Sequence, residues 1–166
     1  MQKALEITQL NKWYRHKVHA LKDLSLSVNK GDFFALLGAN GAGKSTTMNV
    51  LTCDIAATAG NAYIAGECVN GDDPGAVTRA RRFLGYCPQI DPLIELQTPR
   101  ETLRMFGRLR GIPHETVNEK VNQLLVRLSL TQYADNTSES LSGGNKRKLS
   151  LGIALIGDPK VLLIDE

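Results

Sequence analysis

A glycine-rich stretch that ends in a lysine and a serine points most directly to chemistry. Residues 38–45 read GANGAGKS, which satisfies the phosphate-loop pattern G-x-x-x-x-G-K-[ST]. Glycines let the backbone wrap around an anion with its N–H groups turned inward. Lys44 would reach the β- and γ-phosphates of a nucleotide such as ATP, and the Ser45 hydroxyl would bind Mg²⁺. The predicted loop contacts are Gly38, Ala39, Asn40, Gly41, Ala42, Gly43, Lys44, Ser45 and Thr46.

A second chemical feature is the pair of carboxylates that closes the sequence VLLIDE, residues 161–166. An apolar run predicts a buried strand, and acids at its exit are costly unless they have a function. This arrangement fits a Walker B motif, in which Asp165 would hold Mg²⁺ through water. Glu166 would then polarise the attacking water as a general base. The alternative is a strand end whose two acids simply face solvent.

A third feature is the stretch LSGGN, residues 141–145, which stands immediately before a predicted helix. Ser142 can cap that helix, and the two glycines leave backbone N–H groups open to an anion. One ATP cannot easily use both this site and the phosphate loop of the same chain if they lie far apart. A head-to-tail dimer, with each ATP between one chain's GANGAGKS and the other chain's LSGGN, would use both. The alternative is an ordinary Ser-capped helix that follows a flexible loop.

The pattern of apolar residues predicts an α/β fold that positions these three features. Alternation or short apolar runs predict strands, and spacings of three and four predict helices. The continuous apolar run at 32–38 predicts a strand buried on both faces. Leu103, Phe106 and Leu109 are expected on one side of a helix. The expected strands are 4–14, 19–29, 32–38, 61–69, 83–88 and 161–164, and the expected helices are 44–53, 76–82, 98–110, 113–128 and 146–156, with a loop at 140–144.

The string LSGGN followed by KRKLSLGIALIGDPKVLLIDE resembles the signature motif running into Walker B of ABC-type ATPases. The resemblance extends over essentially the whole chain. It implies a P-loop NTPase with a RecA/F1-like core of the ABC type, an N-terminal antiparallel β part and an inserted helical subdomain. Residues 1–166 would form a single ATP-binding domain, with the core at 1–91 and 141–166 and the helical subdomain at 92–140.

The resemblance also implies roles for individual residues. Tyr14 stands where the family has an aromatic ring that stacks on adenine, and Trp13 is the neighbouring alternative. Gln89, in GYCPQ, stands at the Q-loop, which touches Mg²⁺ and water and links to the membrane domain. The expected catalytic residues are Glu166, Gln89 and Lys44, the expected Mg²⁺ ligands are Ser45, Gln89 and Asp165, and the expected contacts to a partner domain's ATP are Ser142, Gly143, Gly144 and Asn145.

A longer string, SGGNKRKLS, together with YCPQ and RLRGIP, resembles the A subfamily of ABC transporters. Asn145 replaces the usual Gln of the signature, and its amide should still donate to phosphate or ribose. The resemblance implies an ATP-hydrolysing domain that powers lipid transport as a nucleotide-sandwich dimer. Its partners would be a second ATP-binding domain and transmembrane domains, at the cytoplasmic side of a membrane.

Domains of this family continue beyond Walker B into a D-loop, further strands and a switch histidine. The three histidines here, His16, His19 and His114, all precede residue 166. We therefore expect a C-terminally incomplete domain, which binds nucleotide rather than turning it over when isolated. The remaining alternatives are an inactive nucleotide-binding fragment and a soluble ABC-type ATPase without a transport role.

Composition limits the other function classes. Lys and Arg number 20 and Asp and Glu 17, a net charge of +3, which is too balanced to argue for nucleic acid as a partner. Cys53, Cys68 and Cys87 lack metal-like spacing and are expected to be reduced thiols in a cytosolic setting. The N-terminus does not resemble a signal peptide, and no stretch approaches the roughly 18 apolar residues of a membrane span.

Overall fold

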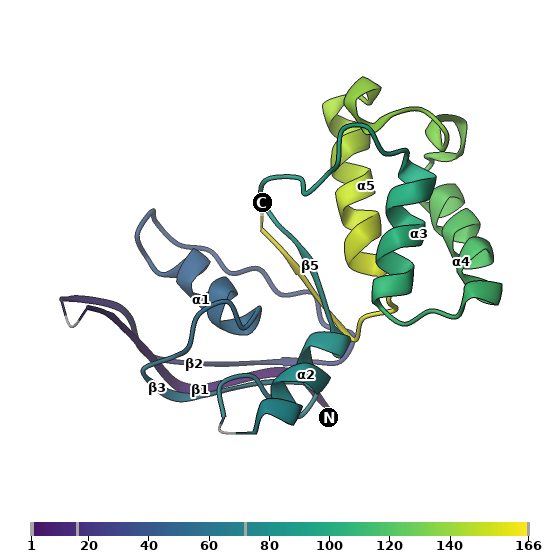
Figure 1. Cartoon of the computed structure of the whole chain (residues 1–166). Helices are drawn as coiled ribbons and strands as arrows, with labels where there is room; N and C mark the ends of the chain where they lie inside the picture. Colours follow the sequence, from purple (N-terminus) through teal and green to yellow (C-terminus); the bar gives the residue numbers. More distant parts are fainter. Residues whose placement is uncertain (1, 16, 72, 166) are drawn as a thin grey trace. The chain divides into compact units, whose positions relative to one another are not determined.

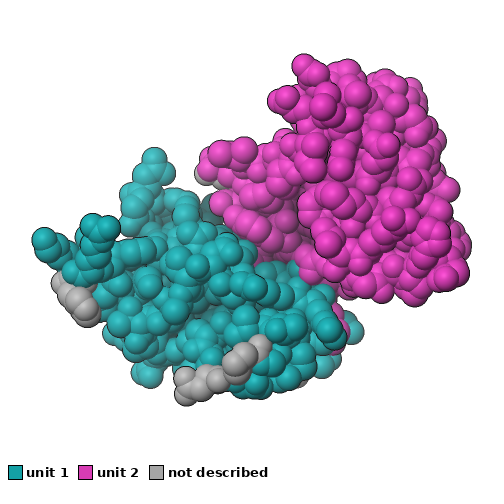
Figure 2. Space-filling view, in the orientation of Figure 1, with its two compact units in different colours: residues 1–84 teal, residues 85–166 magenta. Residues whose placement is uncertain are grey.

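A computed structural model of the chain describes residues 2–15, 17–71 and 73–165. It divides into two compact units, residues 1–84 and 85–166 (Figure 2). Each unit is described by itself below. The boundary between the two units lies at residues 84 and 85. It does not test the expected boundaries of the helical subdomain, 92–140, which stay a prediction.

The first unit is built on a four-stranded antiparallel sheet in the order β2-β1-β3-β4. Its two long strands match the expected ranges to within one residue. The single strand expected at 61–69 is instead a tight hairpin, because Ala65 (φ 50°) and Gly66 (φ 88°) both adopt positive φ, as a two-residue turn requires. The strands are β1 (Lys3–Tyr14), β2 (Val18–Asn29), β3 (Ala59–Ile64) and β4 (Glu67–Cys68).

Two helices pack against this sheet (Figure 1). Helix α1 (Lys44–Leu51) contacts β2 and β3 and buries Val50 and Leu51. Helix α2 (Pro74–Phe83) contacts β3 and β4, and the Asp73 side chain caps it by accepting a hydrogen bond from the Gly75 N–H. Burial of these apolar faces holds the start of α1, and the loop before it, close to the sheet.

The strand expected at 32–38 is absent, and the prediction is wrong at this point. Residues 32–39 have no regular secondary structure. Phe33 is 98% exposed and Leu37 is 87% exposed. An apolar run forms a buried strand only where neighbouring strands pair with its backbone and cover its faces. Within the described residues, no strand pairs with this segment.

The second unit contains three helices around one apolar core (Figure 1). Helix α3 (Pro99–Leu109) contacts both α4 (His114–Arg127) and α5 (Gly143–Leu155). Two 3₁₀ turns, η1 (Thr131–Tyr133) and η2 (Ser138–Ser140), connect α4 to α5. The core is formed by Leu103, Val117, Val121, Leu124, Leu125, Leu130, Ala134, Leu141, Leu149, Ile153 and Ile156.

Two expectations for these helices are corrected. Leu109 is 74% exposed, whereas Leu103 is fully buried. Residues six apart on a helix differ by about 120° in direction, because each residue turns the chain by about 100°. Helix α5 begins at Gly143 rather than residue 146, so the expected loop at 140–144 is largely ordered into η2 and the first turn of α5.

The strands β5 (Leu84–Cys87) and β6 (Val161–Ile164) form a two-stranded sheet. Leu163 is buried, but Ile164 is 46% exposed. The expected strand is therefore present, while the expectation that it is buried throughout is wrong at its last residue. The Asp165 N–H donates a hydrogen bond to the Cys87 carbonyl oxygen at 2.9 Å, which holds the first acid beside the end of β5.

Candidate functional site: two glycine-bearing helix starts

The phosphate loop adopts a wrapped backbone that favours glycine at two points. Gly41 has φ 83° and Gly43 has φ 93°, in the left-handed region that costs other residues energy. The Ala42 N–H donates to the Ala39 carbonyl oxygen at 3.1 Å and tightens the turn. No described side chain caps α1, so the N–H groups of its first turn remain available to an anion.

Gly43 also fits against the sheet. A Cβ at this position would lie 2.7 Å from the Ala20 carbonyl oxygen and 2.8 Å from Leu21 Cδ2. Both residues belong to β2. The absence of a side chain therefore lets the loop rest directly on the strand, which fixes the start of α1.

Lys44 folds back across the loop. Its ammonium group donates to the carbonyl oxygens of Gly38 at 2.6 Å and Ala39 at 3.1 Å. Ser45 follows on the exposed first turn of α1, and Thr46 beside it is half-buried. A cation, a hydroxyl and unbonded N–H groups are thus grouped within a few residues, as phosphate binding requires.

The two aromatic candidates lie at the end of β1, each about two-fifths exposed. Trp13 stacks on His19, with ring centroids 4.1 Å apart and planes 12° from parallel. The ammonium group of Lys12 lies 5.3 Å from the centroid of the Tyr14 ring. Among the residues that the structure describes, no ring stacks on Tyr14, which keeps it the better candidate for adenine.

The second helix start, at α5, has a different geometry. Ser142 is the N-cap, as predicted, and its side chain accepts a hydrogen bond from the Asn145 N–H at 3.3 Å. A Cβ on Gly143 or Gly144 would meet no described atom within 4 Å, and both residues are exposed. Internal packing does not require glycine here. The two glycines leave the helix start open to an approaching group.

The remaining expected site residues lie in the second unit, where β5 and β6 end. Gln89 follows β5 and is exposed, and Asp165 follows β6 and is half-buried. Within the described residues, the Asp165 carboxylate has no hydrogen-bond or ion-pair partner. Glu166 lies outside the described residues, so its expected role stays a prediction.

These residues offer the ligands that Mg²⁺ prefers. A hydroxyl, an amide oxygen and a carboxylate are hard oxygen donors, and they come from Ser45, Gln89 and Asp165. In the described part of the chain, no cluster of three or more His, Cys, Asp or Glu side chains is placed to hold a metal by itself. Ser45 belongs to the first unit, and Gln89 and Asp165 belong to the second. By the chemistry of their oxygen donors alone, these residues suit Mg²⁺ with phosphates as further ligands better than a metal held by protein alone.

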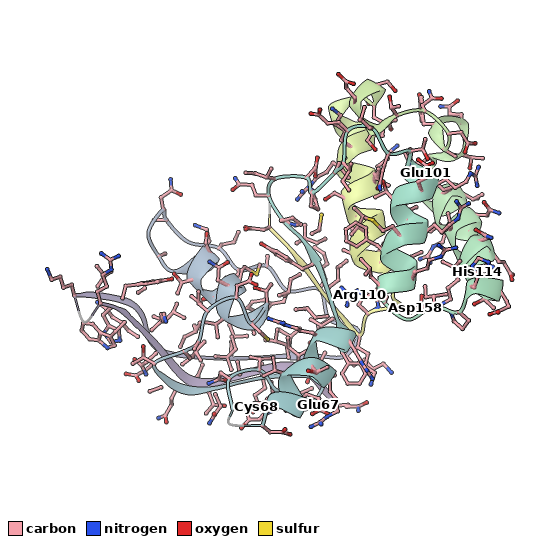
Figure 3. The ribbon with its side chains drawn as sticks, viewed as in Figure 1. Glu67, Cys68, Glu101, Arg110, His114 and Asp158 are labelled. Carbon is pink, nitrogen blue, oxygen red and sulfur yellow. The ribbon has the colours of Figure 1, made fainter. Side chains whose placement is uncertain are left out.

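Two features of this unit were not predicted from the sequence. Arg147, on α5, contacts the segments on both sides of Gln89 and the backbone of Asp165. A hollow of about 430 Å³ lies along α3, lined by Glu101, Arg104, Met105, Arg108 and Leu109; Glu101 lies at the first turn of that helix (Figure 3). The contacts of Arg147 could not be predicted, because a single arginine in a helix gives no local sequence signal of its distant partners.

A wrapped GANGAGKS loop before a helix defines a P-loop nucleotide-binding protein. A family comparison identifies the particular class: the chain belongs to the ABC transporter family, whose model matches residues 21–166. The expected family is therefore confirmed.

The relatives support the A subfamily. The chain is 46% identical over 164 residues to the human phospholipid-transporting ATPase ABCA3 and 44% identical over 163 residues to the human phospholipid-transporting ATPase ABCA7. Each alignment covers 98% of this chain but only 9% and 7% of the relative. The chain thus spans less than a tenth of the length of these relatives.

Solved structures confirm the ABC-type fold. A dimeric bacterial ABC transporter cassette, MJ0796, superimposes with a TM-score of 0.84 at 26% identity, covering 98% of this chain and 73% of that one. The same cassette in a post-hydrolysis state bound to ADP and Pi gives the same values. Within the described residues, no helix is both long and apolar enough to cross a membrane.

Proposed function

We propose that the chain is an ATP-binding and ATP-hydrolysing domain that powers the movement of phospholipid by a transmembrane transporter. It acts as a nucleotide-sandwich dimer with a second domain of the same kind. The observation that carries this proposal is the open start of α5. Gly143 and Gly144 have no packing reason to be glycine, although glycine disfavours a helix. An approaching phosphate from the partner's ATP supplies the reason.

Each residue then has a defined task. The N–H groups around Gly41 and Gly43 and the ammonium group of Lys44 bind the phosphates. Ser45, Gln89 and Asp165 would hold Mg²⁺, which when bound would neutralise charge that develops on the phosphates. Glu166 accepts the proton of the attacking water. Tyr14 stacks on the adenine ring.

The cargo and the membrane partner follow from the relatives. Relatives that are 44–46% identical are named as phospholipid-transporting ATPases, which supports a phospholipid cargo and a position at the cytoplasmic side of a membrane. The hollow along α3, with apolar Met105 and Leu109 at its lining, supports contact between this helical part and the transmembrane domains.

The test separates binding from turnover. Binding of a fluorescent ATP analogue is measured on the 166-residue chain, and ATP hydrolysis and transfer of a labelled phospholipid are measured on the full-length gene product in vesicles. Lys44→Ala should weaken binding by about ten- to a hundredfold, because a hydrogen bond to a charged group contributes about 1.5–3 kcal/mol. Lys22→Ala, on the exposed surface of β2, is the matched control. Equal binding by both variants would contradict the assigned site.

Glu166→Gln addresses hydrolysis. In the full-length product, this variant should keep ATP binding and lose turnover, because the amide cannot accept the water's proton. Undiminished turnover would show that the general base is another residue. Binding without turnover by the wild-type gene product would favour a nucleotide-binding module instead.

A further inference from the structure

Within the described part of the chain, Arg147 donates hydrogen bonds to acceptors at Pro88, Asp91 and Asp165, which belong to two separate chain segments. Its Nη1 donates to the Pro88 carbonyl oxygen and, at 3.1 Å, to Oδ1 of Asp91. Its Nη2 donates to the Asp165 carbonyl oxygen at 3.0 Å. The Arg147 side chain is 31% exposed and that of Asp91 24% exposed. The guanidinium is thus held between the exits of β5 and β6.

These acceptors surround the expected magnesium ligands. Pro88 and Asp91 stand on either side of Gln89, and the Asp165 carbonyl belongs to the residue whose carboxylate faces the metal in the proposed site. The two exits already touch through the hydrogen bond from the Asp165 N–H to Cys87. Arg147 supplies a further connection between these two chain segments.

Only an arginine can make this set of contacts. Its planar guanidinium carries five donors in a fixed geometry, whereas the lysine ammonium is a compact point charge. Two of the three acceptors are backbone carbonyl oxygens, so their positions depend on the path of the chain. Loss of the guanidinium would leave both carbonyls and the Asp91 carboxylate without this donor.

We propose that Arg147 is a positioning residue that sets the distance between Gln89 and Asp165. It does not touch nucleotide; it holds the loop after β5 and the end of β6 in the spacing that hydrolysis needs. This inference rests on the proposed ATPase function and adds a residue that the family motifs did not assign. Arg147 also lies on α5, whose start forms the second phosphate site. It therefore connects three elements of the proposed site: the loop after β5, the end of β6 and helix α5.

The second unit offers a matched control. Arg100, on α3, is 29% exposed in its side chain. Its guanidinium likewise makes three hydrogen bonds, two to the Asp135 carboxylate at 2.8 and 3.1 Å and one to Asn122 Oδ1 at 2.6 Å. None of these partners is an expected site residue. Arg100→Met therefore removes a similar set of bonds without releasing β5 or β6.

The first experiment measures ATP hydrolysis by the full-length gene product. Arg147→Met should lower kcat by roughly ten- to a hundredfold, as displacements of about 1 Å can, with KM for ATP within about threefold of wild type. Arg147→Lys should recover part of the loss, and Arg100→Met should leave kcat within about twofold. An unchanged kcat in Arg147→Met, or an equal loss in Arg100→Met, would overturn the proposal.

Asp91→Asn keeps the inference testable if Arg147→Met fails to fold. This variant should lower kcat less than Arg147→Lys does, and it should add no further loss in the Arg147→Lys background, because Asp91 is proposed to act only through its contact with Arg147. Fully additive losses would overturn the coupling.

The second experiment is independent of hydrolysis. Amide hydrogen exchange in the 166-residue chain should rise in residues 86–91 and 161–165 on Arg147→Lys and stay unchanged there on Arg100→Met. Unchanged exchange in both segments would overturn the positioning role. If exchange rises as expected while Lys44→Ala leaves hydrolysis intact, the proposed function fails and the structural anchor stands.

Discussion

Gly43 lies so close to Ala20 that a Cβ on residue 43 would be 2.7 Å from the Ala20 carbonyl oxygen. The obstructing atom belongs to the backbone of β2, so it cannot move aside as a flexible side chain would. The phosphate loop can therefore pack against the sheet only because residue 43 has no Cβ atom. Gly143, at the other helix start, has nothing within 4 Å of its Cβ position. Glycine thus allows close packing at the start of α1, and it leaves the backbone N–H groups open at the start of α5.

Gly43→Ala should destabilise the chain more than a positive φ alone explains. A left-handed non-glycine residue costs about 1–2 kcal/mol, and overpacking adds about 1–3 kcal/mol. Gly31→Ala is the control, because Gly31 has φ 91° but open space around its Cβ position. Urea unfolding of both variants measures the difference in free energy of unfolding. Equal losses would show that the contact with Ala20 relaxes without cost.

Gly144→Ala should have the opposite effect on stability. Alanine favours a helix over glycine by up to about 1 kcal/mol, and nothing obstructs its methyl group, so the free energy of unfolding should rise or stay constant. Turnover of the full-length product should nevertheless fall, because the methyl group covers N–H groups meant for phosphate. Lys148→Ala, exposed on α5, is the control. Unchanged turnover would show that the start of α5 is an ordinary Ser-capped helix start with no role in phosphate binding.

Tyr14→Ala should weaken ATP binding by the 166-residue chain by between about twofold and tenfold, since an aromatic stack contributes about 0.5–1.5 kcal/mol. Tyr14→Phe should retain most of the affinity, because the ring remains. Trp13→Ala should change affinity little, because Trp13 is already stacked on His19. Titration with a fluorescent ATP analogue measures all three. A larger loss in Trp13→Ala would assign the adenine ring to Trp13.

Acid should weaken the second unit through Asp135. Hydrogen bonds from Arg100 lower the pKa of the Asp135 carboxyl from its ordinary 3.8. A lowered pKa means that the pair's stabilisation is complete above about pH 4 and is lost as the pH falls through the folded-state pKa.

The measurement is urea unfolding of wild type and Asp135→Asn across a pH series. The variant should be less stable at neutral pH, and the difference should shrink as the pH falls below about 4. A difference that stayed constant down to about pH 2 would mean that the ion pair is not the cause.

Local features were predictable because each rests on neighbouring residues. The phosphate loop, the Ser142 cap and the long strands β1 and β2 depend on turn chemistry and on alternation over a few positions. Elements that depend on remote partners were not. The run at 32–38 has the composition of a buried strand, yet it remains irregular because no described strand pairs with it.

The sequence by itself determined the family of this protein and the groups proposed for its chemistry, because the backbone N–H groups, the cation and the carboxylates of the proposed nucleotide site lie in unbroken motifs. Only the tertiary structure decided how they are held. Arg147 meets Asp91 from 56 positions away and Pro88 from 59, and Gly43 meets Ala20 across the surface of a sheet. Such contacts have no local pattern, because they arise where packing of the apolar core brings distant backbone segments together.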